Sequence, residues 1–331
     1  MVSLRRRWLV IVVLLTLVPC TAARCQQPGK QKPKSAAKTP VIPENVVLES
    51  NVQYGNAGGR ALVLDVVRPR EAGEKPRPAI VFVHGGGWSG GNKESAVGSL
   101  IPFASTGNYF CATVEYRLSG EAIWPAQIQD CKAAVRWLKA NAKKYNIDPK
   151  RIGVWGGSAG GHLVSMLGLT GGVRELEGDG GWPDQSSRVA CVVDFCGPSD
   201  FPSIAKVKAD AGRNAYGPVS KLLGGPVEEN EELAKAASPL SYVSKDAPPF
   251  LIVHGTADNT VPLAQAESLY EALKISGADA TFVKIEGGGH GIRGIEVLNR
   301  VRNFFDKHLL GRNVVVSDKA IPFSPAPQSK K

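Results

Sequence analysis

The sequence has few residues of the kind that bind metals. Only six cysteines and five histidines occur among its 331 residues, and no two cysteines show the C-x-x-C spacing that commonly holds zinc. We therefore expect neither a metal ion nor an organic cofactor. No internal repeat is evident either.

The chain also lacks a basic body that could follow a nucleic acid. Its net charge is +10, but that charge lies at the ends. Residues 1–43 carry eight basic and no acidic side chains, and residues 311–331 carry four basic and one acidic. Because the part between is close to neutral, we expect no nucleic-acid partner.

The apolar run at the N-terminus is too short to span a bilayer comfortably. Trp8–Val18 has about 11 residues, whereas a transmembrane helix needs roughly 20. An arginine triplet precedes this run and small residues follow it, a pattern typical of a signal peptide. We predict a signal peptide over residues 1–23 and a secreted or periplasmic protein without a stable membrane span after cleavage. A lipoprotein anchor at Cys20 is the alternative, although Pro19 fits such signals poorly.

Four cysteines remain in the body of the chain, within or next to strand-like and helix-like runs: Cys111, Cys131, Cys191 and Cys196. Buried free thiols are the simplest interpretation. Export would permit a disulfide, but the sequence does not choose a pairing.

The length suits one large domain, since α/β domains commonly exceed 200 residues without splitting. Residues 24–44 are rich in lysine, proline, glutamine and alanine, which favours a flexible linker. Residues 311–331 are predicted to be a flexible tail. The catalytic domain is therefore expected over residues 45–310.

Strand-like and helix-like runs alternate along that domain, which predicts an α/β fold: a mostly parallel sheet of about eight strands with helices on both faces. The first two strands should pair antiparallel. The expected strands are Val46–Tyr54, Ala61–Val67, Ala79–Val83, Tyr109–Tyr116, Ile152–Trp155, Val189–Phe195, Phe250–Val253 and Thr281–Ile285. The clearest expected helices are Pro125–Lys144, Leu263–Ile275 and Ile295–Leu309, the last closed by Gly311. Residues 171–183 and 201–243 are interpreted as insertions that shape a pocket at the strand ends.

The strongest motif is Gly156-Gly157-Ser158-Ala159-Gly160, which directly follows a buried strand and precedes a helical stretch. This is the G-x-S-x-G nucleophile elbow in its required context. Glycines permit the sharp turn, and the following helix directs free N–H groups toward the serine. The pentapeptide alone also occurs in ordinary glycine-rich turns, but its context predicts Ser158 as a nucleophile.

A second glycine motif, His84-Gly85-Gly86-Gly87-Trp88, follows the strand that ends at Val83. Backbone N–H groups of such a loop approach the oxyanion of a tetrahedral intermediate. We expect an oxyanion hole formed by Gly86, Gly87 and Ala159. His84 is expected to brace the loop.

A serine nucleophile needs a histidine base and a carboxylate that orients it. His290 lies in a glycine-rich loop after the last strand, and Asp258 follows the strand before it, in the order expected for this arrangement. The other four histidines lie in or next to strands and helices. Asp258 could instead cap the helix that follows, and Glu286 is a weaker alternative acid.

These motifs resemble those of exported esterase and lipase-like hydrolases with the α/β-hydrolase fold. The similarity is greatest to the branch that includes bacterial bifunctional feruloyl and acetylxylan esterases, and it covers most of residues 45–310. Further shared segments are Glu115-Tyr116-Arg117-Leu118, Trp124-Pro125-Ala126, Arg136-Trp137-Leu138, Gly160-Gly161-His162 and Pro248-Pro249-Phe250. The resemblance implies triad roles for Ser158, Asp258 and His290.

The resemblance and the predicted export together imply a secreted serine esterase that acts on acetyl or feruloyl esters of polysaccharides. A carboxylesterase for small esters is the nearest alternative, and a peptidase for short peptides is more distant, because no propeller precedes the hydrolase domain. A non-catalytic binder that retains the fold is a third possibility. The sequence does not indicate an oligomeric state.

Overall fold

A computed structural model describes residues 40–210 and 217–323. The predicted signal peptide and most of the predicted linker lie outside the described residues, as does the alternative lipoprotein cysteine Cys20. None of the helices in the described ranges combines the length and the apolar character needed to cross a membrane.

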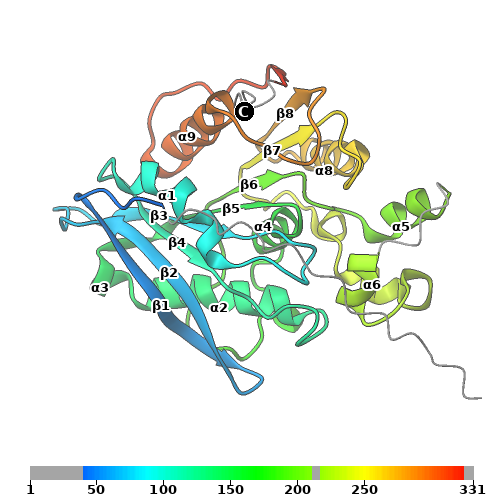
Figure 1. The fold of residues 1–331 in the computed structure, drawn as a ribbon, viewed down its shortest axis with the longest axis horizontal. Helices are drawn as coiled ribbons and strands as arrows, with labels where there is room; N and C mark the ends of the chain where they lie inside the picture. The colour runs from blue at the N-terminus through cyan, green and yellow to red at the C-terminus, as the bar shows by residue number, and fades with distance from the viewer. Residues whose placement is uncertain (1–39, 211–216, 324–331) are drawn as a thin grey trace, which may run out of the picture. The chain divides into compact units, whose positions relative to one another are not determined.

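The described residues form one twisted sheet of nine strands in the order β1-β2-β4-β3-β5-β6-β7-β8-β9 (Figure 1). The strands are β1 (Val46–Ala57), β2 (Arg60–Pro69), β3 (Arg77–Val83), β4 (Phe110–Val114), β5 (Ile147–Gly157), β6 (Cys191–Phe195), β7 (Phe250–Gly255), β8 (Ala280–Glu286) and β9 (Ile321–Pro322). The predicted α/β-hydrolase architecture is confirmed, with one strand more than expected.

The strands β1 and β2 form the predicted antiparallel pair, and β2 also runs antiparallel to β4. From β4 onward every neighbouring pair is parallel. The inner strands are buried on both faces, which explains their continuous apolar runs. Because parallel strands end at the same edge, the loops that follow β3, β5, β7 and β8 come together there.

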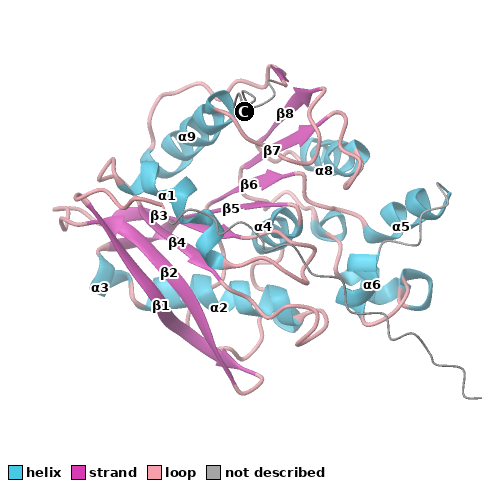
Figure 2. Ribbon diagram, viewed as in Figure 1, coloured by secondary structure: helices cyan, strands magenta, loops and turns pink. Residues whose placement is uncertain are grey.

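Helices cover both faces of the sheet (Figure 2). On one face pack α2 (Ala126–Ala140), α4 (Ala159–Leu169) and α8 (Leu263–Ile275). On the other pack α1 (Val97–Ala104) and α9 (Ile295–Leu310). The predicted helix over Pro125–Lys144 is interrupted at Asn141 and continues as the short α3 (Ala142–Tyr145). Gly311 ends α9 in the left-handed conformation, with φ 67°, as its position predicted.

The segment between β6 and β7 carries α5 (Phe201–Asp210), α6 (Gly217–Leu223) and α7 (Glu231–Ala236). Pro218 of α6 packs on the glycine loop after β3, since a Cβ built on Gly87 would lie 3.3 Å from the Pro218 Cβ. This insertion therefore lies over the strand end where the site is expected.

The predicted end of the catalytic domain at residue 310 is wrong. Residues beyond Gly311 return to the sheet, where Ile321 pairs with Ile285 of β8 and is 8% exposed. The Phe323 N–H donates to the Glu286 carbonyl over 2.9 Å. A two-residue strand is too short to give a periodic pattern, so the proline and serine near the end of the chain dominated the prediction.

Within the described ranges, Cys111, Cys131, Cys191 and Cys196 are buried and unpaired. The interpretation as buried thiols is therefore confirmed for these four residues.

Candidate active site

Ser158 lies on the sharp turn between β5 and α4. Its backbone has φ 57° and ψ −122°, a conformation that side chains rarely adopt. The Ser158 N–H donates to the Phe195 carbonyl on the neighbouring strand over 2.7 Å. This bond holds the strained turn and leaves the serine hydroxyl at the edge of the sheet.

The glycines around Ser158 are required by close backbone contacts. A Cβ on Gly160 would lie 2.1 Å from the Val83 carbonyl oxygen and 2.8 Å from that of His84. A Cβ on Gly156 would lie 2.4 Å from the Gly160 carbonyl oxygen. All three distances are too short for any side chain, so the spacing of the motif follows from the packing of β5 against β3.

The second glycine loop lies against this elbow. A Cβ on Gly85 would lie 3.4 Å from the Ser158 Cβ, so the two turns touch. Gly86 and Gly87 follow with φ of 117° and 58°, in the region that favours glycine. Ala159 begins α4, so its N–H has no acceptor within the helix. The structure thus brings the elbow and the glycine loop together at the predicted place.

Aromatic residues hold the glycine loop in place. The His84 Nδ1–H donates to the Gly85 carbonyl over 2.8 Å, and the ring stacks on Tyr116 at 4.3 Å between centroids. The Trp88 indole N–H donates to His162 Nδ1 over 3.2 Å, and His162 Nε2 donates to the Ala237 carbonyl over 2.7 Å. Burial lowers the pKa of His162 to about 4, so this histidine stays neutral.

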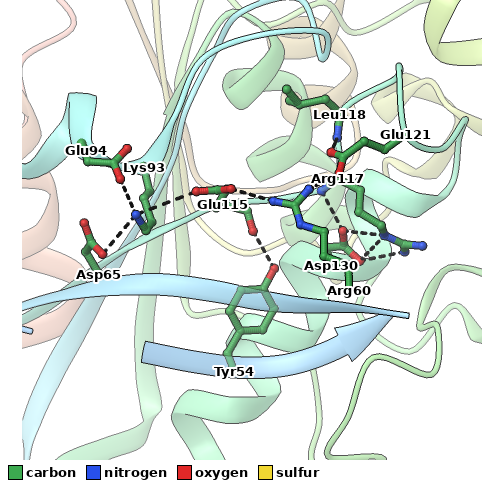
Figure 3. Close-up of polar contacts among 10 residues, drawn as sticks. All are labelled: Tyr54, Arg60, Asp65, Lys93, Glu94, Glu115, Arg117, Leu118, Glu121 and Asp130. Atoms are coloured by element: carbon green, nitrogen blue, oxygen red, sulfur yellow. Dashed lines mark hydrogen bonds and ion pairs between the residues drawn. The ribbon is translucent and has the colours of Figure 1, made fainter. Parts of the chain in front are cut away.

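Charged residues fix the far end of the glycine loop (Figure 3). The Lys93 side chain is only 2% exposed and forms ion pairs with Asp65, Glu94 and Glu115. Burial opposes its charge, but the hydrogen bond that Lys93 donates to Glu94 and the nearby carboxylates raise the pKa of Lys93 overall. Arg60 extends the cluster by pairing with Glu115 at 2.6 Å and also with Glu121.

Two further hydrogen bonds tie the loop to β4 and to the segment after it. The Thr113 hydroxyl donates to the Lys93 carbonyl over 2.9 Å, and the Ser119 N–H donates to the Trp88 carbonyl over 2.7 Å. Tyr54 of β1 donates its hydroxyl to the Glu115 carbonyl over 2.8 Å (Figure 3). The loop is therefore held at both ends before any ligand arrives, which favours preorganised N–H donors.

His290 lies between Ser158 and Asp258 and is within hydrogen-bond distance of both. Its Nε2 lies 2.8 Å from the Ser158 hydroxyl oxygen, and its Nδ1 lies 2.7 Å from Asp258 Oδ2. The His290 side chain is 28% exposed, whereas that of Asp258 is fully buried. Three side chains that are far apart in the sequence thus form one continuous chain of hydrogen bonds.

Asp258 is held by four N–H groups. Oδ1 accepts from the backbone of Thr260 and Val261 over 2.8 and 3.0 Å. Oδ2 lies near His290 and also near His254, whose Nε2 is 3.3 Å away. Burial alone would raise the pKa of Asp258, but the hydrogen bonds from His254, His290 and the two backbone groups outweigh it and lower the pKa well below its usual range.

The sequence left two alternatives to Asp258 as the acid: that Asp258 caps the next helix, or that Glu286 orients the histidine. Asp258 does not cap α8, because the residue before that helix is Pro262 and no side-chain cap forms there. Glu286 is exposed at the end of β8, and among the described residues the carboxylate bonded to His290 is that of Asp258.

A pocket of about 240 Å³ opens beside Ser158 and His290. Its apolar walls are Phe82, Trp155, Phe195 and Ile292, and Ser99 and Cys196 complete the lining. Burial and the nearby Asp258 raise the pKa of the Cys196 thiol, so the thiol stays protonated. The pocket suits a small, mostly apolar group attached to the reacting carbon.

Cys196, Asp258 and His290 offer possible metal ligands within 4.8 Å of one another. However, both oxygens of Asp258 already accept two N–H groups each, and the Cys196 thiol points to the His290 carbonyl at 3.6 Å. These hydrogen bonds account for the grouping, so this donor set does not indicate a metal site.

The sequence prediction missed three residues at the site. Lys93 gave no signal, because burial of a lysine depends on carboxylates from other segments. Cys196 was noted only as a thiol near a strand end. His254 was set aside as a strand residue, although its position four residues before Asp258 places both at the end of β7.

Residues 64–273 match the family described as BD-FAE. The chain belongs to the BD-FAE family. This BD-FAE protein is 31% identical over 242 residues to Esterase LipC of Mycobacterium tuberculosis, a match that covers 72% of this chain and 59% of LipC. It is 32% identical over 229 residues to the probable carboxylic ester hydrolase LipM of the same organism, covering 68% and 52%. The chain thus spans between half and two thirds of the length of these curated relatives.

Solved structures similar to this BD-FAE protein include esterases. A truncated form of a carbohydrate esterase from gut microbiota has 34% sequence identity and a TM-score of 0.74, and the match covers 82% of this chain and 100% of that one. A bifunctional GH43-CE protein from Bacteroides eggerthii has 31% identity and a TM-score of 0.71, with 79% and 38% covered. Esterase 2 of Thermogutta terrifontis, in its native form, has 26% identity and a TM-score of 0.65, with 80% and 92% covered.

Proposed function

We propose that the protein is a serine hydrolase that cleaves carboxylic esters through an acyl-enzyme. The observation that carries this proposal is the unbroken chain of hydrogen bonds from the Ser158 hydroxyl through His290 to Asp258. The esterase names of the relatives support the same reaction class.

In this mechanism the Ser158 oxygen attacks the ester carbonyl while His290 Nε2 takes the hydroxyl proton. Asp258 keeps the other imidazole proton on Nδ1, so that Nε2 can accept. The N–H groups of Gly86, Gly87 and Ala159 would stabilise the oxyanion. His290 then gives its proton to the leaving alcohol, and water hydrolyses the acyl-enzyme by the same steps.

The proposed nucleophile can be tested by covalent labelling. A fluorophosphonate probe should attach to Ser158 stoichiometrically, because His290 activates this hydroxyl and the strained elbow exposes it. Intact mass spectrometry and peptide mapping measure the adduct. Folded protein that remains unlabelled after prolonged incubation, or a label on another residue, would contradict the proposal.

We further propose that the substrates are acetyl or feruloyl esters on polysaccharides. We also propose that the protein acts outside the cytoplasm, because residues 1–23 have the pattern of a signal peptide. Two similar structures support the choice of substrate, since one is a carbohydrate esterase and the other a GH43-CE protein. The small size of the pocket beside Ser158 favours the second candidate, a carboxylesterase for small esters.

A comparative screen separates these substrates. We expect kcat/KM for acetylated or feruloylated xylan fragments to exceed that for aminoacyl amides by at least roughly 100-fold, with p-nitrophenyl acetate as the small-ester reference. Released acetate, ferulate and amine are each quantified by chromatography. A higher kcat/KM for the small ester than for every xylan fragment would favour the carboxylesterase, and preference for amides would contradict both.

A further inference from the structure

His254 is a fully buried histidine beside the proposed triad that the mechanism above does not use. It is the last residue but one of β7, four residues before Asp258. Its Nε2 lies 3.0 Å from the Val261 carbonyl oxygen and 3.3 Å from Asp258 Oδ2. Its Nδ1 is buried without a hydrogen-bond partner among the described residues.

These neighbours determine where the proton of His254 lies. Both groups facing Nε2 are acceptors, since one is a carbonyl and the other is a carboxylate whose pKa lies well below its usual range. Nε2 must therefore carry the hydrogen. His254 thus donates from Nε2.

The Nε2–H group bridges both ends of the turn that carries the acid. One acceptor is Asp258 itself, and the other is the carbonyl of Val261, whose own N–H bonds to Asp258 Oδ1 over 3.0 Å. The imidazole therefore fixes the turn over residues 258–261 in one orientation. It also shares Oδ2 with His290, whose Nδ1 donates to the same oxygen over 2.7 Å.

We propose that His254 is a positioning residue for the reaction: it orients the Asp258 carboxylate toward His290 and, by sharing Oδ2, limits how strongly that oxygen stabilises protonated His290. This inference rests on the proposed serine hydrolase function. His254 thereby tunes the base His290, whereas a buried strand residue is ordinarily expected only to pack.

Other ionisable groups pack around this pair. The Cys196 thiol faces Asp258 and His290 within 4.8 Å. Asp194 of β6 is also nearby; burial raises the pKa of this carboxyl, and its oxygens accept from Ser165 and Gly197 over 2.8 and 2.9 Å. Neither group donates to Asp258 Oδ2 in the described structure, so His254 is the side chain that competes with His290 there.

The test compares two substitutions at this position with a matched control. His254→Phe keeps a ring but removes the donor, whereas His254→Gln places an amide N–H near the position of Nε2. His308→Phe is the control, because His308 lies in α9 against Phe304, away from the site. Active sites are counted by fluorophosphonate titration, and kcat, KM and the pH profile of kcat/KM are measured for each protein.

We expect His254→Phe to lower kcat per titrated site about 10- to 100-fold with KM changed less than about threefold, the effect of losing one hydrogen bond to a charged group. The acidic limb of the kcat/KM profile should move to higher pH by roughly 0.5 to 1 unit, because Oδ2 then serves protonated His290 alone. His254→Gln should recover most of both quantities, and His308→Phe should match the wild type.

A fall in titratable sites with unchanged kcat per site and an unmoved acidic limb would overturn the inference, because it would indicate a merely structural role. Equal behaviour of His254→Gln and His254→Phe would do the same. If His254→Phe does not fold, His254→Asn replaces it, since its shorter side chain cannot bring a donor to Asp258. Failure of the proposed function is recognised separately, as wild-type protein without esterase activity or label.

Discussion

Replacing Ser158 with alanine should reduce kcat for p-nitrophenyl acetate by roughly 10⁴- to 10⁶-fold, because no acyl-enzyme can form without the hydroxyl. KM should change little, since the pocket walls and the backbone N–H groups remain. The elbow should tolerate the change, because alanine keeps the Cβ that already fits there. Initial rates at high enzyme concentration, corrected for spontaneous hydrolysis, measure the residual activity.

Ser276→Ala is the matched control. Ser276 follows α8, and its hydroxyl donates only to the local Leu273 carbonyl over 2.8 Å. This variant should keep wild-type kcat. Undiminished turnover in Ser158→Ala would mean that another group attacks the ester, whereas a wild type as inactive as Ser158→Ala would favour a binding protein with this fold.

The site could be predicted because its chemistry imposes short local patterns. Ser158 lies between glycines that closely packed backbone requires, and His290 and Asp258 each follow a recognisable strand. The parallel sheet then brings these strand ends to one edge, so the order along the chain was enough to predict the meeting of three distant side chains.

Lys93 and His254 could not be predicted in the same way. Their roles depend on partners contributed by packing: Asp65 of β2 and Glu115 after β4 for Lys93, and the orientation of the Asp258 turn for His254. A local pattern predicts an exposed lysine and an apolar strand end at these positions. Only the three-dimensional arrangement shows that both side chains are buried and hydrogen-bonded beside the proposed oxyanion loop and acid.

The domain boundary was missed for a related reason. The segment after α9 contributes only Ile321 and Pro322 to the sheet among its described residues. The β8 edge provides the hydrogen-bond partners for this short strand, as the bond from Phe323 to Glu286 shows. Tertiary pairing, rather than local propensity, orders the segment.

Asp258→Asn should lower kcat about 10³- to 10⁴-fold while leaving the fold intact. All four neighbours of the carboxylate are N–H donors, from His254, His290, Thr260 and Val261. An amide NH₂ at either oxygen position would face two of them. His290 would then turn its Nδ1 lone pair toward the amide and carry its proton on Nε2, where it can no longer accept from Ser158.

Asp246→Asn provides the control for this exchange, because the Asp246 side chain is exposed at the surface. It should show wild-type kcat, and steady-state rates together with a thermal melt compare the two variants. Activity of Asp258→Asn within tenfold of the wild type would show that another carboxylate orients His290. In that case Glu286→Gln should be the damaging substitution, because Glu286 is the last residue of β8 and precedes the loop of the base.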